Sequence, residues 1–331
     1  MGQERRCNQP EAVALVVNPR AGGGKGARGY AEAAEILRAY GIEAASFETS
    51  PEAGADVAAQ AALSAGSEEI WVVGGDGTLR PALASIVAAD AVLGVIPAGT
   101  SNCLAMELGA PPEVRAAVAW LLEQPIGRMD LGRCDDQLFS VRVGIGLEAL
   151  GARIAERDKR GLGPLAYVLA GIKALREGQA TPVVIRAQGE TVYEGRTLTA
   201  IVSNVTLHPM LRFLGRGRAN PADGTLHITI VEDAPALVHL GDWLMGAAHD
   251  EPHLQRIVEH RAPAFEIEAG REVEVHLDGE ATARARRLKI ECLPGHIKVR
   301  GKVGRYWSPT TGISRSGRTT KLLSGTPELM M

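Results

Sequence analysis

Three short stretches of the sequence combine glycine with hydroxyl, amide or carboxylate side chains: "NPRAGGGKG" (18–26), "GGDGT" (74–78) and "PAGTSN" (97–102). Each stretch follows an apolar run that is typical of a buried strand. Glycine lets backbone N–H groups approach a ligand closely, and the amino ends of helices add positive dipole ends. These turns therefore predict a rim that binds anionic oxygens, above all those of phosphate.

Asp76 is the one carboxylate within these glycine turns. A carboxylate among phosphate-binding amides repels phosphate unless a cation intervenes, so a Mg²⁺-nucleotide is the economical partner. The alternative is an aspartate that merely favours a turn. Thr78, Thr100, Ser101 and Asn102 can bind the nucleotide or cap helices, and we expect Thr78 and Ser101 to do both.

Two familiar phosphate-binding loops fit this sequence badly. A Walker A loop needs Ser or Thr after its Gly-Lys pair, whereas Lys25 is followed by Gly26. The dinucleotide pattern G-x-G-x-x-G can be laid only loosely onto "GGGKGARG". The glycine turns therefore indicate a different nucleotide site.

A second acidic stretch, "HLDGE" (276–280), lies at the end of a predicted strand. Asp-Gly is a common hairpin turn, so one interpretation is purely structural. Asp278 and Glu280 are two residues apart and can face the same way. Near a nucleotide cleft, such a carboxylate can accept the proton of a substrate hydroxyl.

Two further groups could hold a cation. The stretch "NPADGTLHI" (220–228) places Asp223 in a loop rich in carbonyl groups, which is typical of a plain turn or of a cation site. His249, His253 and His260 are close in sequence, but no carboxylate or cysteine pattern accompanies them. We expect these histidines to have surface or helix-end roles.

The elements that must position the glycine turns alternate between strand and helix up to about residue 125. "VALVVNP", "IEAASFET", "EIWVVGG" and "AVLGVIPAGT" predict strands, with helical segments between them. This alternation predicts βαβ units and an open, mostly parallel sheet, in which ligands bind at the carboxyl ends of the strands. All three glycine turns fall at those ends.

From residue 129 onward, short alternating runs predict a β-rich sandwich or barrel. They include "ETVYEG", "TLTAIVSN", "REVEVHLDGE", "RRLKIECL" and "HIKVRG". Helical patterns at 165–175 and 236–248 interrupt them. We therefore expect an α/β nucleotide domain at 11–128, a β-rich substrate domain at 129–304 and a mobile tail at 305–331.

Composition excludes several classes of protein. The chain has 331 residues, 36 of them basic and 39 acidic, and its formal charge of −3 argues against a nucleic acid partner. The sequence has no run of about eighteen apolar residues, so we expect no transmembrane helix. The four cysteines lie far apart without metal-type spacing, which suits the reducing cytoplasm.

Two segments combine basic and apolar residues in a way that suits a membrane surface. Arg153, Arg157, Lys159 and Arg160 precede the apolar helix, and "LRFLGRGR" (211–218) has the same character. Such segments dock to anionic lipid, although an ordinary core helix with solvated flanks is the alternative. We expect transient membrane association from the cytoplasm, and the pattern leaves a homodimer open.

The motifs "VVNPRAGGGKG", "VVGGDGTL", "LGVIPAGTSN", "GLGPLAYVLAGIKAL" and "LDGE" together resemble the diacylglycerol kinase catalytic-domain superfamily, which includes bacterial soluble lipid kinases and the sphingosine and ceramide kinases. The resemblance spans roughly residues 12–301. It implies ATP in a cleft between an α/β domain and a β-sandwich domain. It also implies that the DGE segment supplies the proton acceptor.

The expected site residues follow from the motifs and the resemblance together. The nucleotide set is Asn18, Pro19, Arg20, Ala21, Gly22, Thr49, Gly74, Gly75, Asp76, Gly77, Thr78, Leu79, Arg80, Thr100, Ser101 and Asn102. The resemblance further implies a structural Mg²⁺ near Asn220, Asp223 and Thr225. The expected catalytic carboxylates are Asp76, Asp278 and Glu280, with a slight preference for Asp278 as the base.

The sequence departs from the family pattern at three places. Cys103 follows Asn102 where many bacterial members have Asp, Arg80 replaces a small polar residue, and "LRFLGRGR" replaces a glycine-rich stretch. The function we expect is an ATP-dependent lipid kinase that acts on a hydroxyl of a diacylglycerol-like or long-chain-base lipid. The alternatives are a kinase of a soluble nucleotide or small alcohol and a catalytically silent binding protein.

Overall fold

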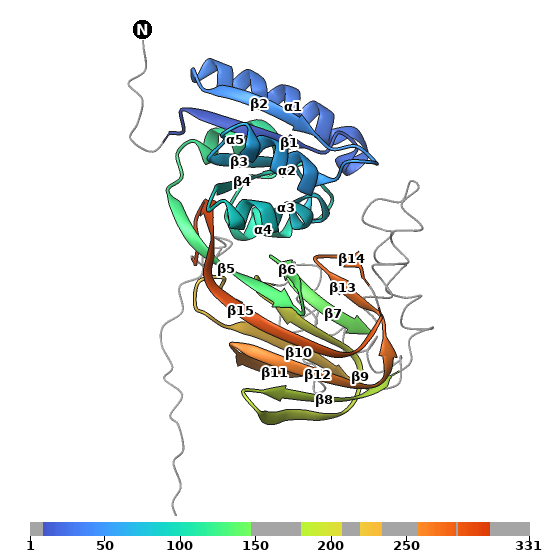
Figure 1. Ribbon diagram of the computed structural model, residues 1–331. Coiled ribbons are helices and arrows are strands. Elements are labelled where there is room, and N and C mark those ends of the chain that lie inside the picture. Colours follow the sequence, from blue (N-terminus) through green and yellow to red (C-terminus); the bar gives the residue numbers. More distant parts are fainter. Residues whose placement is uncertain (1–8, 147–179, 207–218, 234–256, 283, 305–331) are drawn as a thin grey trace, which may run out of the picture.

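The computed structural model describes residues 9–146, 180–206, 219–233, 257–282 and 284–304. The helices expected at 165–175 and 236–248, the basic segments 153–160 and 211–218, and the tail 305–331 lie outside these residues. The described chain forms an N-terminal α/β part and a C-terminal part made of strands (Figure 1). This arrangement confirms the fold class predicted from the sequence.

The N-terminal part is built on four parallel strands in the order β2-β1-β3-β4. Their bounds are β1 Ala12–Val17, β2 Glu43–Glu48, β3 Glu69–Gly74 and β4 Val92–Pro97. Successive side chains of a strand point to opposite faces, so β1 serves two cores. Leu15 belongs to one apolar cluster and Val16 to the other.

Helices cover both faces of this sheet. The cluster that contains Leu15 includes residues of α1 (Ala21–Ala39) and α5 (Val114–Leu121). The cluster that contains Val16 includes residues of α2 (Ala55–Ser64), α3 (Asp76–Ala88) and the short α4 (Cys103–Glu107). The sheet is therefore doubly wound, and the carboxyl ends of its strands share one edge.

The C-terminal part is a β-sandwich. Its strands are β5 Ile126–Cys134, β6 Gln137–Phe139, β7 Arg142–Gly146, β8 Thr181–Ala187, β9 Glu190–Ser203, β10 Leu226–Glu232, β11 Ile257–Ala262, β12 Ala264–Val273, β13 Val275–Leu277, β14 Glu280–Ala281 and β15 Ala285–Arg300. One apolar cluster, with Phe139, Val202 and Phe265 among its members, fills the space between them.

The strand β9 is continuous where the sequence predicted two runs, "ETVYEG" and "TLTAIVSN". The apparent break is Gly195. A Cβ on Gly195 would lie 2.8 Å from the phenol oxygen of Tyr193, so the glycine makes room for that ring and does not form a turn. Because it is long, β9 pairs with β8 through its first half and with β7 and β10 through its second.

The strand β15 joins the two parts of the molecule, which the sequence did not predict. It pairs with β12 and β5 in the sandwich, shifts register between Leu293 and Ile297, and then continues into the N-terminal sheet. There Lys298 and Val299 lie parallel to Val92 and Leu93 of β4. The final residues of the predicted β-rich segment therefore extend the parallel sheet.

A buried ion pair fixes the end of β15. The Arg300 side chain is 2% exposed, and its Nε and Nη2 donate to the two carboxylate oxygens of Glu69 at 2.5 and 2.7 Å. Its Nη1 donates to the carbonyl oxygen of Gln124 at 2.9 Å, and the indole of Trp71 donates to the same carboxylate at 2.7 Å. The contact ties β15 to β3.

Glu69→Gln is expected to destabilise the protein by about 3–5 kcal/mol, because it leaves the Arg300 charge buried without its counter-ion. Thermal unfolding measures the effect. Glu35→Gln is the matched control, since its pair with Arg115 lies on the surface with both side chains more than half exposed, where such pairs contribute roughly 0–1 kcal/mol. Equal melting temperatures for the two variants would contradict the assigned role.

Candidate active site

The three glycine turns meet at the carboxyl edge of the parallel sheet. Gly22 has a left-handed backbone (φ +56°), and a Cβ there would lie 2.3 Å from the carbonyl oxygen of Ala98. A Cβ on Gly99 would lie 2.5 Å from Cα of Gly75. Glycine is therefore required at these positions because the turns pack directly against one another.

Polar side chains fix the relative positions of the turns. The amide of Asn18, at the end of β1, donates to the hydroxyl of Thr78 at 3.0 Å. Asn102, itself in a left-handed conformation (φ +50°), closes the third turn by accepting from the backbone N–H of Gly99 at 2.8 Å and donating to its carbonyl at 3.0 Å. These bonds hold the rim in one shape.

Asp76 caps the helix α4. Its carboxylate accepts from the backbone N–H groups of Cys103 and Leu104 at 2.9 and 3.1 Å. We expected Thr78 and Ser101 to cap helices, and this is wrong for the described helices. The N-cap residues of α3 and α4 are Gly75 and Asn102, and neither makes a side-chain cap. The hydroxyl of Thr78 instead accepts a bond from Asn18. Each oxygen of Asp76 accepts one of these bonds, which leaves lone pairs for a cation.

Of the other residues predicted to bind the nucleotide, some lie near the glycine turns and one, Leu79, is buried in the core. Thr49 follows β2 and donates its N–H to the Val17 carbonyl at 2.8 Å, beside Asn18, while Thr100 is exposed on the third turn. Leu79 is a residue of α3 whose side chain is 1% exposed and packs into the core, and its N–H donates to the Gly75 carbonyl. Leu79 therefore offers no polar atom to a nucleotide, and nucleotide contact by the others stays a prediction.

Gly75→Val is expected to reduce ATP affinity by at least about tenfold, a loss of ~1.4 kcal/mol. A Cβ on Gly75 would lie 3.0 Å from Cα of Gly99, so valine would push two turns of the rim apart and displace their N–H groups. Calorimetric titration with ATP measures the loss. Ala84→Val, at an exposed position of α3, is the control. An undiminished ATP affinity of the Gly75 variant would contradict the prediction that the glycine turns bind the nucleotide phosphates.

The DGE segment forms the hairpin turn between β13 and β14, with left-handed Asp278 (φ +51°) and Gly279 (φ +87°). Two consecutive positive φ angles are typical of a type I′ turn. The expectation that Asp278 and Glu280 face the same way is not met, because these turn residues interrupt the alternation of the strand. The two carboxylates have different environments.

Asp278 points into the protein. One oxygen accepts from the backbone N–H and the hydroxyl of Ser140 at 2.8 and 3.0 Å, and the other accepts from the N–H groups of Val141 and Arg142 at 2.8 and 2.9 Å. Burial raises the pKa of Asp278, the backbone bonds oppose that shift, and nearby Asp76 adds to it. With four bonds made, this carboxylate fixes the loop 140–142.

Glu280 points the other way, across the boundary between the two parts. Its Oε2 accepts from Nη2 of Arg80 on α3 at 2.7 Å, and its side chain is 36% exposed. A Cβ on Gly77 would lie 2.7 Å from Oε1 of Glu280. One oxygen of Glu280 therefore lies against the amino end of α3, and α3 faces β6 and β14 in Figure 1.

Cys103 stands beside these acidic groups. Burial raises the pKa of its thiol to about 12, and Asp76 contributes to the shift. A thiol with so high a pKa is protonated at neutral pH, which makes it a poor nucleophile. Nη1 of Arg142 lies 4.0 Å from Cys103 Sγ, so Arg142 reaches the same boundary, although its "SVRVG" context gave no signal beyond a strand.

Two family models together cover most of the chain. Residues 12–134 match the diacylglycerol kinase catalytic domain, and residues 141–301 match the YegS C-terminal NAD kinase beta sandwich-like domain. The chain belongs to the diacylglycerol kinase catalytic-domain family. The resemblance inferred from the motifs is thereby confirmed.

Individual relatives agree with this family. A Pseudomonas aeruginosa protein described as "Probable lipid kinase YegS-like" is 31% identical over 246 residues, which cover 72% of this chain and 78% of the relative. A diacylglycerol kinase of Staphylococcus haemolyticus is 26% identical over 271 residues, covering 80% and 81%. The crystal structure of a diacylglycerol kinase from Bacillus anthracis is 26% identical, with a TM-score of 0.71, and the match covers 88% of this chain and 97% of that one.

In the loop expected to hold a structural Mg²⁺, the carboxylate of Asp223 already has partners. Oδ1 of Asp223 already accepts from the N–H and hydroxyl of Thr225 at 3.0 and 2.6 Å, and Oδ2 faces Arg261 at 3.5 Å. Oδ1 of Asn220 is buried and has no partner among the described residues. Asp223 thus faces a guanidinium, the described residues contain no group of three His, Cys, Asp or Glu side chains that could hold a metal, and a cation held by Asn220, Asp223 and Thr225 stays a prediction.

Asp130, which the sequence did not single out, shapes this loop instead. It is 3% exposed, and its two oxygens accept from the N–H groups of Gly224 and Gly295 at 2.7 Å each. The Asp-Gly pair at 223–224 is therefore held by a carboxylate of β5.

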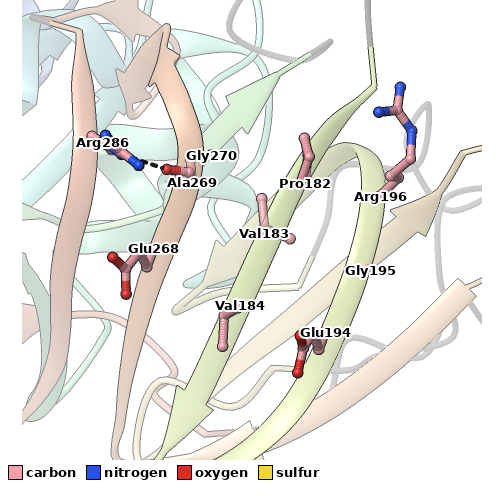
Figure 2. A pocket seen from close by; sticks show the side chains of 10 residues that line it. All are labelled: Pro182, Val183, Val184, Glu194, Gly195, Arg196, Glu268, Ala269, Gly270 and Arg286. Carbon is pink, nitrogen blue, oxygen red and sulfur yellow. Dashed lines mark hydrogen bonds between the residues drawn. The ribbon is translucent and has the colours of Figure 1, made fainter.

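A groove of about 400 Å³ lies elsewhere, on the strands β8, β9 and β12. Figure 2 shows its lining, with Val184 and Glu194 on one side and Glu268 and Arg286 on the other. Nε of Arg286 donates to the carbonyl of Ala269 at 3.1 Å. Its strand β8 lies at the end of the sandwich away from the N-terminal part (Figure 1), and the groove contains none of the predicted site residues.

Proposed function

We propose that this protein is an ATP-dependent lipid kinase that transfers the γ-phosphoryl group to a hydroxyl of a diacylglycerol-like or long-chain-base lipid. Membership of a lipid kinase family supports the class of reaction. The observation that carries the proposal for this chain is the position of Glu280, a carboxylate of the sandwich that lies against the amino end of α3. It brings a proton acceptor to the edge of the glycine rim.

The rim is the proposed site of the nucleotide phosphates. The left-handed glycines at 22–24 form a loop of the kind whose N–H groups can turn toward anionic oxygens. The amino end of α3 adds a positive dipole end. Asp76 is the carboxylate that would hold the Mg²⁺ of the nucleotide, and that ion would neutralise charge on the phosphate oxygens.

Glu280 is the proposed proton acceptor. The lipid hydroxyl oxygen attacks the γ-phosphorus, the bond from that phosphorus to the ADP oxygen breaks, and the hydroxyl proton passes to Oε1 of Glu280. The products are a lipid phosphate and ADP. We assign this role to Glu280 in preference to Asp278 because all four bonds of Asp278 are directed at the loop 140–142.

The test is to incubate the purified protein and Mg²⁺ with γ-labelled ATP and either a bacterial lipid extract or NAD, and to separate the products. Label in a lipid product supports the proposal. Label in NADP would instead make the protein a kinase of a soluble nucleotide, and ATP binding without transfer to either acceptor would make it a silent binding protein.

We also propose that the protein reaches its substrate by contact with the membrane surface. No helix of the described residues is long and apolar enough to cross a bilayer. The basic residues at 153–160 and 211–218 are expected to contribute about 1 kcal/mol each when they approach an anionic surface. Sedimentation with vesicles should show binding that increases with anionic lipid and falls with salt; binding indifferent to lipid charge would refute the electrostatic contribution.

A further inference from the structure

Arg80 connects three elements at the boundary between the two parts of the molecule. It lies in the first turns of α3, and its side chain is 19% exposed. Nη2 donates to Glu280 of β14 at 2.7 Å, and Nη1 donates to the side-chain oxygen of Gln137 on β6 at 3.2 Å. One guanidinium therefore joins a helix of the nucleotide half to two strands of the sandwich.

Stability alone does not account for this arginine. Its Nε is buried and finds no hydrogen-bond partner among the described residues, and a buried donor without a partner costs roughly 1–3 kcal/mol. A shorter polar side chain would avoid that cost. The guanidinium does, however, provide a rigid, planar set of donors, which fixes the direction of a carboxylate better than a flexible ammonium group does.

The contact with Arg80 fixes Glu280 asymmetrically. Oε2 is held by the guanidinium, while Oε1 lies toward Gly77, where a Cβ would come within 2.7 Å. Gly77 is helical and its φ is not positive, so its backbone does not require glycine. The missing side chain leaves the space that this oxygen occupies next to the positive end of α3.

We propose that Arg80 is a positioning residue for the proton acceptor, and that Gly77 provides the space into which it directs Oε1 of Glu280. This inference rests on the proposed kinase function. Arg80 was expected among the nucleotide residues; the proposal assigns it instead a role through Glu280, its partner across the boundary. Its loss should slow the chemical step and leave ATP affinity nearly unchanged.

The experiment is a double-mutant cycle, measured as the rate of phosphoryl transfer at saturating ATP. Arg80→Met should lower kcat by roughly 10²-fold, within the ~10²–10⁴-fold that a positioned base contributes, while KM for ATP changes by less than about twofold. Arg80→Lys keeps the charge and should restore part of the rate. Combined with Glu280→Gln, Arg80→Met should cause no further loss, because both changes remove the same interaction.

The Gly77→Ala variant tests independently whether the space at Gly77 is needed for the position of Glu280. Alanine is favoured over glycine inside a helix, and the atom it would meet is the end of a flexible side chain. The variant should therefore keep or raise its melting temperature, yet transfer phosphate more slowly. In the Glu280→Gln background the same change should have little effect.

Arg115→Met is the matched control, because it removes an exposed arginine paired with Glu35, and it should keep full activity. Multiplicative losses of kcat in the double variants, or a rise in KM with kcat intact, would overturn the positioning role. A wild-type protein without transfer activity would instead remove the proposed function, and the inference with it. That outcome is read from the wild type alone, before any variant is compared.

Discussion

Asp76→Asn is expected to lower phosphoryl transfer by at least about 10²–10³-fold, the scale associated with loss of one charge-stabilising group in an active site. The carboxylate supplies the negative charge that the glycine rim otherwise lacks, and asparagine cannot replace it toward a divalent cation. Turnover should not recover when Mg²⁺ is raised to saturation. Initial rates over a Mg²⁺ series measure the effect.

The same substitution should have a modest effect on folding. Asparagine can still accept one of the two bonds from the N–H groups of Cys103 and Leu104, so the loss is that of a partial helix cap, about 1–2 kcal/mol. Asp56→Asn is the control, because it removes an exposed carboxylate from the first turn of α2. Normal turnover of the Asp76 variant at high Mg²⁺ would reduce Asp76 to a helix cap.

The second large effect distinguishes the two carboxylates of the DGE turn. Glu280→Gln should slow transfer by roughly 10²–10⁴-fold without lowering the melting temperature, because Glu280 is partly exposed and its ion pair is with a single residue, Arg80. Asp278→Asn should instead destabilise the protein. The substitution leaves at least one N–H of the loop 140–142 without an acceptor, which costs ~1–3 kcal/mol of folding free energy. It also weakens the remaining bonds, because they lose the charge of the acceptor.

The comparison between Glu280→Gln and Asp278→Asn requires both the melting temperature and the rate of phosphoryl transfer of each variant. At roughly 2–4 °C per kcal/mol for domains of this size, the Asp278 variant should melt several degrees below wild type. Ser140→Ala removes only one bond to Asp278 and should cause a small shift with activity retained. Glu274→Gln, which also breaks an arginine pair, controls for charge loss near the turn. A stable Asp278→Asn protein that is inactive would make Asp278 the base.

Local patterns predicted the framework of the site well. The alternation of strands and helices before residue 125 depends on neighbours in sequence, and the structure confirms both the parallel sheet and the meeting of the glycine turns at its edge. The Asp-Gly turn was also predictable, because its backbone requirement is local.

The partners of individual side chains were not predictable from spacing. Asp278 bonds a loop 138 residues earlier in the chain, and Arg300 pairs with Glu69 across 231 residues. Their sequence contexts were equally consistent with a catalytic carboxylate and an ordinary strand end. Arg80 was noticed as a departure from the family pattern, but only the fold shows that it reaches Glu280 across the boundary.

The most direct test of the account is a single turnover with wild-type protein. The enzyme is loaded with γ-labelled ATP and Mg²⁺, mixed with anionic vesicles that contain both a diacylglycerol and a long-chain base, and quenched over time. Label is expected to appear in one of these lipids, in proportion to the enzyme, and Glu280→Gln is expected to slow its appearance while ATP binding is kept. Bound ATP whose label stays in the nucleotide, or is released only as inorganic phosphate, would contradict it.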